Sequence, residues 1–203
     1  MQKRITDDRL IDGCLAGDRN AQKSLFEKYR STMLGVCMRY ARDRDEAEDI
    51  LMEGFVKVFL NIREFGFKGS FEGWIRKIMV NTSINHYRKY LKTYYHSEIN
   101  EIEEHEILEE ESITGRFTAD YLMGLINAMP DGYRMVFNLY EIEGYSHKEI
   151  AEMLGISVST SKTQLFYAKK SLKKKIFENL KKDQITGFKG FEDEDLETVQ
   201  ENI

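Results

Sequence analysis

The sequence predicts an all-α fold: two small helical domains, the second containing a helix-turn-helix, joined by an acidic flexible linker. Three observations predict this class. Apolar residues recur at spacings of three and four along most of the chain, and no alternating strand pattern bounded by turns appears. Proline occurs once in 203 residues. Hydrophobic residues make up 41% of the chain, which is enough for packed cores.

The two domains are expected at residues 6–92 and 115–182, with the acidic linker at 93–114 and an acidic tail at 183–203. Acidic segments with few apolar residues cannot bury enough surface to order themselves. We therefore expect the linker to be flexible and the tail to be disordered.

The first domain begins with predicted helices whose ends carry recognisable residues. Thr6 or Asp7 can cap a short helix that ends at Gly17, and Asn20 begins a longer one. Apolar residues at helical spacing predict a third helix over residues 46–62.

The second domain contains the most informative pattern. A helix over residues 117–128 should end at Pro130, and one more helix precedes a helix-turn-helix. Ser146 and Glu149 have the spacing of a capping box at the start of its first helix. Gly155 permits the left-handed turn that leads to its second helix.

The outward face of that second helix is rich in hydroxyls, lysines and aromatic rings. Ser157 or Ser159 can cap the helix. These side chains suit phosphates and base edges of duplex DNA, so we predict a DNA-binding surface. It comprises Ser157, Ser159, Thr160, Lys162, Thr163, Phe166, Tyr167 and Lys170. An ordinary pair of packed helices is the alternative, but the lysine-rich residues 162–182 favour DNA.

The formal net charge of −5 conceals a segregation of charge. Residues 98–111 contain eight acids and no Lys or Arg, and residues 183–203 contain seven acids and one lysine. Without these 15 acids and one base, totals of 35 and 30 become 20 acidic and 29 basic residues. The rest of the chain therefore carries a net charge of about +9, which suits a nucleic-acid partner.

An aromatic, glycine-rich loop at residues 63–74 leads into a polar, basic helix over 71–90. Its aromatic rings can either pack over the core or stack on unpaired bases. For Phe71 and Trp74 taken alone, packing over the core is the preferred interpretation. The basic helix favours binding of a melted DNA strand. The candidate residues are Arg63, Phe65, Phe67, Lys68, Ser70, Trp74, Arg76, Lys77, Asn81, Asn85, Arg88 and Lys89.

Acidic residues gather at the start of the helix over 46–62. The helix dipole explains Asp45, Glu46 and Asp49 in the first turns. It does not explain Glu53, which lies two turns inside. A basic surface on a partner is therefore a second interpretation.

No pattern predicts an enzyme, a metal site or a cofactor. Cys14 and Cys37 lie in helical patterns without a CxxC pair, so we expect buried free thiols. The histidines show no ligand spacing: His86, His96, His105 and His147. No run approaches the ~18 apolar residues of a membrane span and no signal sequence is apparent, so we expect a cytoplasmic protein without membrane insertion.

Five segments together resemble a bacterial RNA polymerase sigma factor of the extracytoplasmic-function group, which keeps only the second and fourth conserved sigma regions. The segments are DEAEDILMEGF at 45–55, FEGWIRKIMVN at 71–81, INHYRK at 84–89, MPDGYRMVF at 129–137 and EIAEMLGIS at 149–157. Each is weak alone, but their order and separation are specific. The resemblance covers about residues 10–175.

The resemblance implies partners for each region. Residues 63–89 would hold the melted minus-ten promoter element, with Asn81 at a position that the family uses, and the helix-turn-helix would read the duplex minus-thirty-five element. The polymerase would be bound at the clamp helices of its largest subunit and at the flap of its second-largest subunit. The clamp-binding residues would be Asp45, Glu46, Asp49, Met52 and Glu53. Such factors are often restrained by an anti-sigma factor.

The chain departs from the family pattern at three positions: Met52 replaces a usual Gln, Asn85 a usual Asp and Ser161 a usual buried Val. Two other interpretations exist. A stand-alone helix-turn-helix transcriptional regulator leaves the aromatic loop and the exposed acids unexplained. An enzyme acting on nucleic acid would need a carboxylate cluster, an activated nucleophile or a phosphate loop, and the sequence shows none of these.

Overall fold

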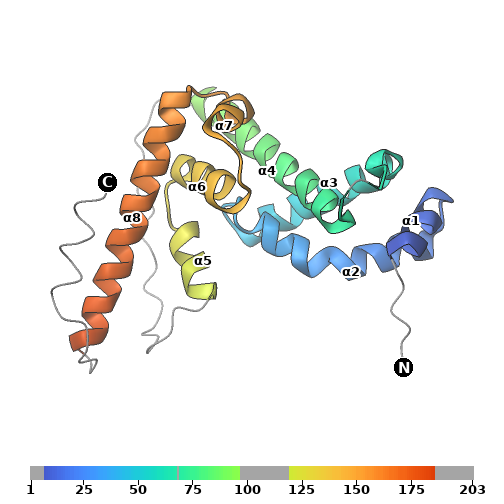
Figure 1. The fold of residues 1–203 in the computed structure, drawn as a ribbon, viewed down its shortest axis with the longest axis horizontal. Coiled ribbons are helices and arrows are strands. Elements are labelled where there is room, and N and C mark those ends of the chain that lie inside the picture. Colours follow the sequence, from blue (N-terminus) through green and yellow to red (C-terminus); the bar gives the residue numbers. More distant parts are fainter. Residues whose placement is uncertain (1–6, 68, 97–118, 186–203) are drawn as a thin grey trace.

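The computed structural model describes residues 7–67, 69–96 and 119–185, with side chains over 7–67, 69–92 and 121–179. Every regular element in these ranges is a helix (Figure 1), which confirms the predicted all-α class. Most of the predicted linker and of the predicted tail lies outside the described residues.

The first domain consists of four helices and one short 3₁₀ turn. They are α1 (Asp7–Leu15), α2 (Arg19–Cys37), α3 (Arg44–Asn61), the 3₁₀ turn η1 (Ile62–Phe65) and α4 (Phe71–His96). The order agrees with the sequence pattern. The turn η1 occupies the start of the predicted loop, and α4 continues four residues past the predicted domain end at residue 92.

Two aspartates make α2 and α3 begin slightly earlier than predicted. Asp18 caps α2, and its carboxylate accepts a hydrogen bond from the N–H of Asn20 at 2.8 Å. Asp43 caps α3 in the same way, accepting from the N–H of Glu46 at 2.8 Å. An aspartate before a helix satisfies N–H groups that have no partner within the helix, which explains both starts.

Helices α2, α3 and α4 enclose the core of the first domain. Their largest fully buried side chains are apolar, and they recur at the helical spacing that the sequence shows. They are Leu25, Met33, Val36, Ile50, Phe55, Val58, Ile75 and Met79. Cys14 and Cys37 are buried free thiols, as predicted.

Gly54 marks the close crossing of α3 and α4. A Cβ atom added there would overlap Sδ of Met79 and lie 2.9 Å from its Cε atom. We expect Gly54→Ala to lower the free energy of unfolding by about 1–3 kcal/mol, because overpacking outweighs the better helix propensity of alanine. Chemical denaturation measures this change.

Gly35 provides the matched control, because an added Cβ meets nothing within 4 Å at this exposed position in α2. Gly35→Ala should raise the free energy of unfolding by about 0.5–1 kcal/mol through helix propensity alone. Equal effects of the two substitutions would contradict the close crossing at Gly54.

Over residues 119–185, the second domain has four further helices, and α6 continues directly into a π-helical turn. They are α5 (Ala119–Asn127), α6 (Asp131–Phe137), the π-helical turn η2 (Asn138–Ile142), α7 (His147–Leu154) and α8 (Val158–Ile185). As predicted, α5 ends shortly before Pro130. Helix α8 extends three residues past the predicted domain end at 182.

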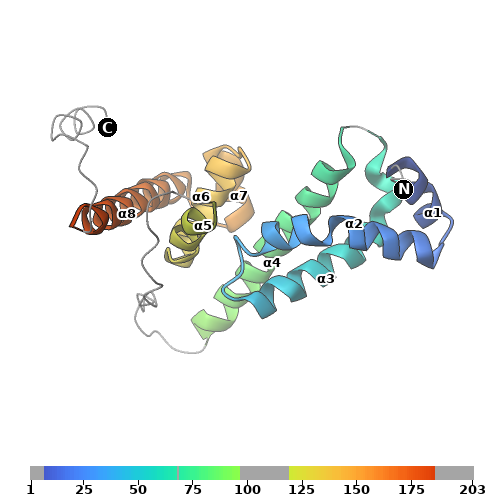
Figure 2. The same ribbon diagram turned by 90° about the horizontal axis from the view of Figure 1, so that it is seen from below.

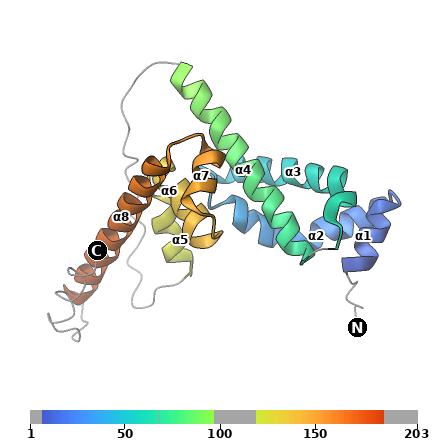
Figure 3. The ribbon, with the colours of Figure 1, turned by 45° about the horizontal axis from the view of Figure 1, so that its top comes forward.

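The two domains pack against each other (Figure 2). Met135, Val136 and Leu139 of the second domain belong to the same buried cluster as the core of the first. Helix α7 also lies against α4 (Figure 3). Sequence patterns predict two domains but say nothing of this contact, because it joins residues about a hundred positions apart.

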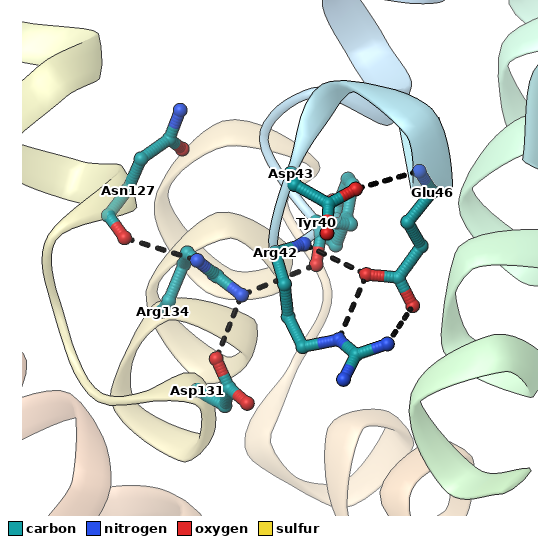
Figure 4. A network of polar contacts seen from close by, with 7 residues as sticks. All are labelled: Tyr40, Arg42, Asp43, Glu46, Asn127, Asp131 and Arg134. Atoms are coloured by element: carbon teal, nitrogen blue, oxygen red, sulfur yellow. Dashed lines mark hydrogen bonds and ion pairs between the residues drawn. The ribbon is translucent and has the colours of Figure 1, made fainter. Parts of the chain in front are cut away.

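The buried Arg134 on α6 joins the domains through backbone carbonyl groups (Figure 4). Its Nη2 donates to the carbonyl oxygen of Tyr40, in the first domain, at 3.4 Å. Its Nη1 donates to the carbonyl oxygen of Asn127 at 3.0 Å, and Nη2 also binds Asp131 Oδ1 at 2.7 Å. A single guanidinium therefore binds three segments of the chain.

Candidate nucleic-acid interface

The predicted capping box begins the helix-turn-helix. Ser146 Oγ accepts a hydrogen bond from the N–H of Glu149 at 3.3 Å, and the N–H of Ser146 donates to Glu149 Oε2 at 2.8 Å. The hydrogen bonds with Ser146 also hold the pKa of Glu149 below its usual value. Gly155 follows α7 with φ of 71°, in the left-handed region. These contacts confirm the predicted start and end of α7.

The second helix of the motif begins at a serine cap. Ser157 Oγ accepts from the N–H of Thr160 at 2.9 Å, which decides between the two predicted capping serines. Ala151 and Leu154 of α7 are buried together with Leu165 of α8. The small Ala151 lets the two helices approach closely, so α8 projects its other face outward.

A polar pair of a buried serine and a half-buried histidine joins the two helices of the motif. Ser161 is fully buried, and its Oγ lies 2.9 Å from Nδ1 of His147. The His147 ring also stacks on Tyr140, with centroids 4.5 Å apart. Burial, followed by the charges of Lys162 and Lys169, holds the pKa of His147 below its usual value. A neutral imidazole thus satisfies the hydroxyl that stands where the family has an apolar side chain.

The structure exposes all eight residues that were predicted to bind duplex DNA. Phe166 and Tyr167 keep 48% and 44% of their surface exposed, which is high for aromatic residues. The ring of Tyr167 stacks on Tyr133 of α6, with centroids 5.9 Å apart, so α6 contacts this face of α8. Exposed rings and hydroxyls on one helix form a surface suited to a DNA groove.

Three lysines of α8 have hydrogen-bond or ion-pair partners in the structure. Lys169 pairs with Glu141 at 2.8 Å, Lys174 pairs with Glu178 at 3.8 Å, and Lys175 donates to a backbone carbonyl oxygen at 3.3 Å. The side chains of Lys181 and Lys182 lie outside the described residues. The two lysines of the predicted DNA-binding set, Lys162 and Lys170, are both exposed.

Helix α4 presents a second polar surface. Lys77, Asn81 and Asn85 are exposed and follow one another at spacings of four, so they form one row along the helix. Arg63, Ser70, Arg88 and Lys89 are exposed as well. Lys68 lies outside the described residues. Asparagine amides and basic groups in such a row can contact bases and phosphates together.

The aromatic rings of the loop differ in how exposed they are. Phe65 is 7% exposed and packs on Phe71 and Trp74, with centroids 4.9 and 5.7 Å away, so little of its ring is free for a base to stack on in this structure. Trp74 is half-buried and stacks on Phe71. Phe67 is 60% exposed, with φ of 54°, a strained conformation for a bulky residue. Such strain is typical of functional sites.

The acidic residues of α3 also differ in accessibility. Asp45 and Asp49 are exposed, whereas Glu46 accepts from the backbone N–H of Arg42 at 2.8 Å and pairs with its side chain. Glu53 is bound by two side chains on its inner side, Lys57 at 2.6 Å and His86 at 2.8 Å. These hydrogen bonds lower the pKa of Glu53, Lys57 contributing most. Asp45, Asp49 and Glu53 are thus exposed on the predicted partner surface, whereas Glu46 is half-buried.

An apolar strip on α3 begins at Met52, a predicted clamp-binding residue, and continues with two residues that the sequence patterns do not single out, Val56 and Leu60. Met52, Val56 and Leu60 are 56%, 54% and 75% exposed and follow one another at spacings of four. Their spacing was visible in the sequence, but spacing cannot separate a buried stripe from an exposed one. Exposed apolar strips flanked by charged residues are typical of protein interfaces.

Neither a metal site nor a membrane span is found in the part of the chain that the structure describes. No group of three or more His, Cys, Asp or Glu side chains there could hold a metal ion. None of the helices is long and apolar enough to cross a membrane. Burial raises the pKa of the Cys37 thiol to about 12 and also raises that of Cys14, so neither thiol is reactive.

Comparison with known families assigns both domains. Residues 25–93 match the family "Sigma-70 region 2", and residues 119–172 match "Sigma-70, region 4". The first match spans α2 to α4, and the second runs from the start of α5 into α8. Both helical surfaces described above therefore lie within matched regions.

Curated relatives agree with these matches over nearly their whole length. The chain is 29% identical over 170 residues to the ECF RNA polymerase sigma factor SigW of Bacillus subtilis, covering 79% of this chain and 91% of the relative. It is 24% identical over 186 residues to the ECF RNA polymerase sigma-E factor of Haemophilus influenzae, covering 87% and 98%.

Among solved structures, the sigma factor RpoE of Bartonella quintana, in complex with the anti-sigma factor NepR, has a TM-score of 0.48 at 19% identity. That alignment covers 78% of this chain and 96% of the other. The family matches and the curated relatives carry the assignment: the chain belongs to the extracytoplasmic-function sigma factors of RNA polymerase, with sigma region 2 in its first domain and sigma region 4 in its second.

Proposed function

We propose that this sigma factor divides promoter recognition between its two domains. Helix α4 and the exposed Phe67 would hold the melted strand of the minus-ten element, and the outer face of α8 would read the duplex minus-thirty-five element. The observation that carries the proposal is the exposed row Lys77, Asn81 and Asn85 in the same domain as the exposed, strained Phe67.

The chemistry of the first surface suits a single strand. An unpaired base can stack on the exposed ring of Phe67, at a gain of about 1–3 kcal/mol per base. The amides of Asn81 and Asn85 can bind the base edges that melting exposes, while Lys77 and Arg88 bind phosphates. The buried rings of Phe65 and Phe71 pack against each other and hold the loop against the core.

The chemistry of the second surface suits a major groove. Ser157 caps the start of helix α8. Ser159, Thr160 and Thr163 are exposed in its first turns, where a recognition helix contacts base edges. Lys162 and Lys170 can bind the flanking phosphates. Lys169, which pairs with Glu141, is not among the predicted DNA-binding residues.

Core polymerase would bind the α3 surface that combines acidic and apolar groups. Asp45 and Asp49 supply exposed charges, and Met52, Val56 and Leu60 supply the apolar strip. The clamp helices of the largest subunit would bind there, and the flap of the second-largest subunit would bind the second domain. The protein would work in the bacterial cytoplasm without chemistry of its own, and an anti-sigma factor would compete for these surfaces.

The decisive experiment is run-off transcription with core RNA polymerase from a related bacterium, with and without the protein, followed by sequencing of the transcript starts. New starts that share two upstream elements would support the proposal and identify the promoter. The stand-alone regulator predicts a different result: DNA binding by the chain alone, with no new starts and no stable complex with core.

A further inference from the structure

We propose that Arg39 and Arg76 form a binding site for a backbone phosphate of DNA, and that Glu143 of the second domain occupies this site in the DNA-free protein. The inference rests on the proposed function, because it assumes that the α4 surface binds DNA. It adds Arg39 to that surface and gives Glu143 an autoinhibitory role.

Glu143 binds the two arginines in the manner of a phosphate. Arg76 makes a bidentate contact with the carboxylate, from Nε to Oε2 at 2.8 Å and from Nη2 to Oε1 at 2.7 Å. Arg39 Nη2 lies 3.8 Å from Oε1. Paired N–H groups of one guanidinium recognise carboxylates and phosphates with the same geometry.

Glu143 satisfies this site only in part. Two guanidinium groups face one carboxylate, and the Arg39 side chain is only 13% exposed. Burial, and then the charge of Arg76, lower the pKa of Arg39. Arg39 Nε is buried without a hydrogen-bond partner among the described residues. A phosphodiester arranges its two anionic oxygens and two ester oxygens around a tetrahedral phosphorus, so donors that approach from different directions, as Arg39 and Arg76 do, can each reach an oxygen.

The local backbone conformation positions the Glu143 carboxylate beside the two arginines. The π-helical turn η2 ends directly before it, and the N–H of Glu143 donates to the carbonyl oxygen of Asn138 at 3.0 Å. Asn138 is buried, and its Nδ2 donates to the carbonyl oxygen of Arg39 at 2.7 Å. Gly144 then turns the chain away with φ of 77°. The ion pair is thus part of the contact between the domains.

This contact lies beside the predicted DNA surface. Arg76 precedes Lys77 on α4, and α7 packs against α4 (Figure 3). A DNA strand that follows α4 must therefore displace Glu143 before a phosphate reaches Arg39 and Arg76.

The test compares Glu143→Gln with Glu141→Gln in the full chain. Both remove one negative charge from the same segment, but Glu141 pairs with Lys169 of the second domain and does not reach the arginines. The probe is a fluorescent single-stranded DNA of about 20 nucleotides, longer than a typical single-strand site. Fluorescence transfer between dyes on the two domains reports the opening of the contact.

Glu143→Gln should raise the DNA affinity about tenfold, steepen its salt dependence by ~0.7 per phosphate gained and increase the distance between the dyes. Glu141→Gln should change the affinity less than about threefold and leave the distance unchanged. Adding Arg39→Gln to Glu143→Gln should abolish the gain in affinity and the added salt dependence. Equal effects of the two glutamine substitutions, or a gain that survives without Arg39, would overturn the proposal.

Glu143→Asp is the second variant, in case Glu143→Gln leaves the buried arginines too poorly compensated to fold. It keeps the charge but shortens the side chain, so its DNA affinity should lie between those of the wild-type protein and Glu143→Gln; a wild-type affinity would overturn the proposal. This oligonucleotide assay does not depend on polymerase. Absence of run-off transcription would therefore reject the sigma-factor proposal without deciding the role of Glu143.

Discussion

Replacing Phe65 with alanine should lower the free energy of unfolding by about 3–5 kcal/mol, whereas Phe67→Ala should lower it by at most about 1 kcal/mol. Phe65 is 7% exposed and its ring contacts Phe71 and Trp74, so truncation leaves a cavity. Phe67 is 60% exposed and contacts Phe65 only at a tilted angle, with centroids 5.3 Å apart. Urea denaturation followed by tryptophan fluorescence measures both changes.

Phe67→Ala, which should change the free energy of unfolding little, should instead weaken the binding of DNA. We expect Phe67→Ala to weaken binding of DNA with a melted minus-ten segment by about tenfold to a hundredfold in the complex with core polymerase, because a stacking surface is lost. Phe67→Trp, which keeps a ring, should retain most of the affinity. A Phe67→Ala variant with wild-type affinity would show that no base stacks on this ring.

Arg134→Ala should lower the free energy of unfolding by about 3–5 kcal/mol. The guanidinium is buried and donates to the carbonyl oxygens of Tyr40 and Asn127 (Figure 4). Alanine leaves these acceptors without a donor, leaves Asp131 without its ion pair and opens a cavity at the contact between the domains. Thermal unfolding should therefore shift to lower temperature.

Arg42→Ala is the matched control for Arg134→Ala. Arg42 belongs to the same network and pairs with Glu46, but its side chain is 46% exposed. It also lies over the ring of Tyr90, 4.2 Å from the centroid. Exposed ion pairs and cation-π contacts contribute little, so the loss should be about 1 kcal/mol. Losses of equal size would show that Arg134 does not join the domains.

Local features of the fold could be predicted because their causes lie within a few residues. The capping box of Ser146 and Glu149 and the left-handed turn at Gly155 depend on hydrogen bonds and backbone angles inside one segment. The outer face of α8 follows from its helical periodicity in the same way. The missed caps at Asp18 and Asp43 are local as well, and their residue type could have revealed them.

Other features depend on which surfaces the folded chain brings together. Phe65 and Phe67 are the same residue type two positions apart, and only the packing on Trp74 buries one and exposes the other. Likewise, nothing near Arg39 in the sequence indicates Glu143 as its partner.

The sequence by itself therefore determined the order of the helices, the capping box of α7, the helix-turn-helix and the family. The tertiary structure decided which aromatic rings are exposed, that α3 carries an apolar strip and that the two domains share a core. The physical reason is range: propensity and capping act within a helical turn, whereas burial depends on contacts between residues far apart in the chain.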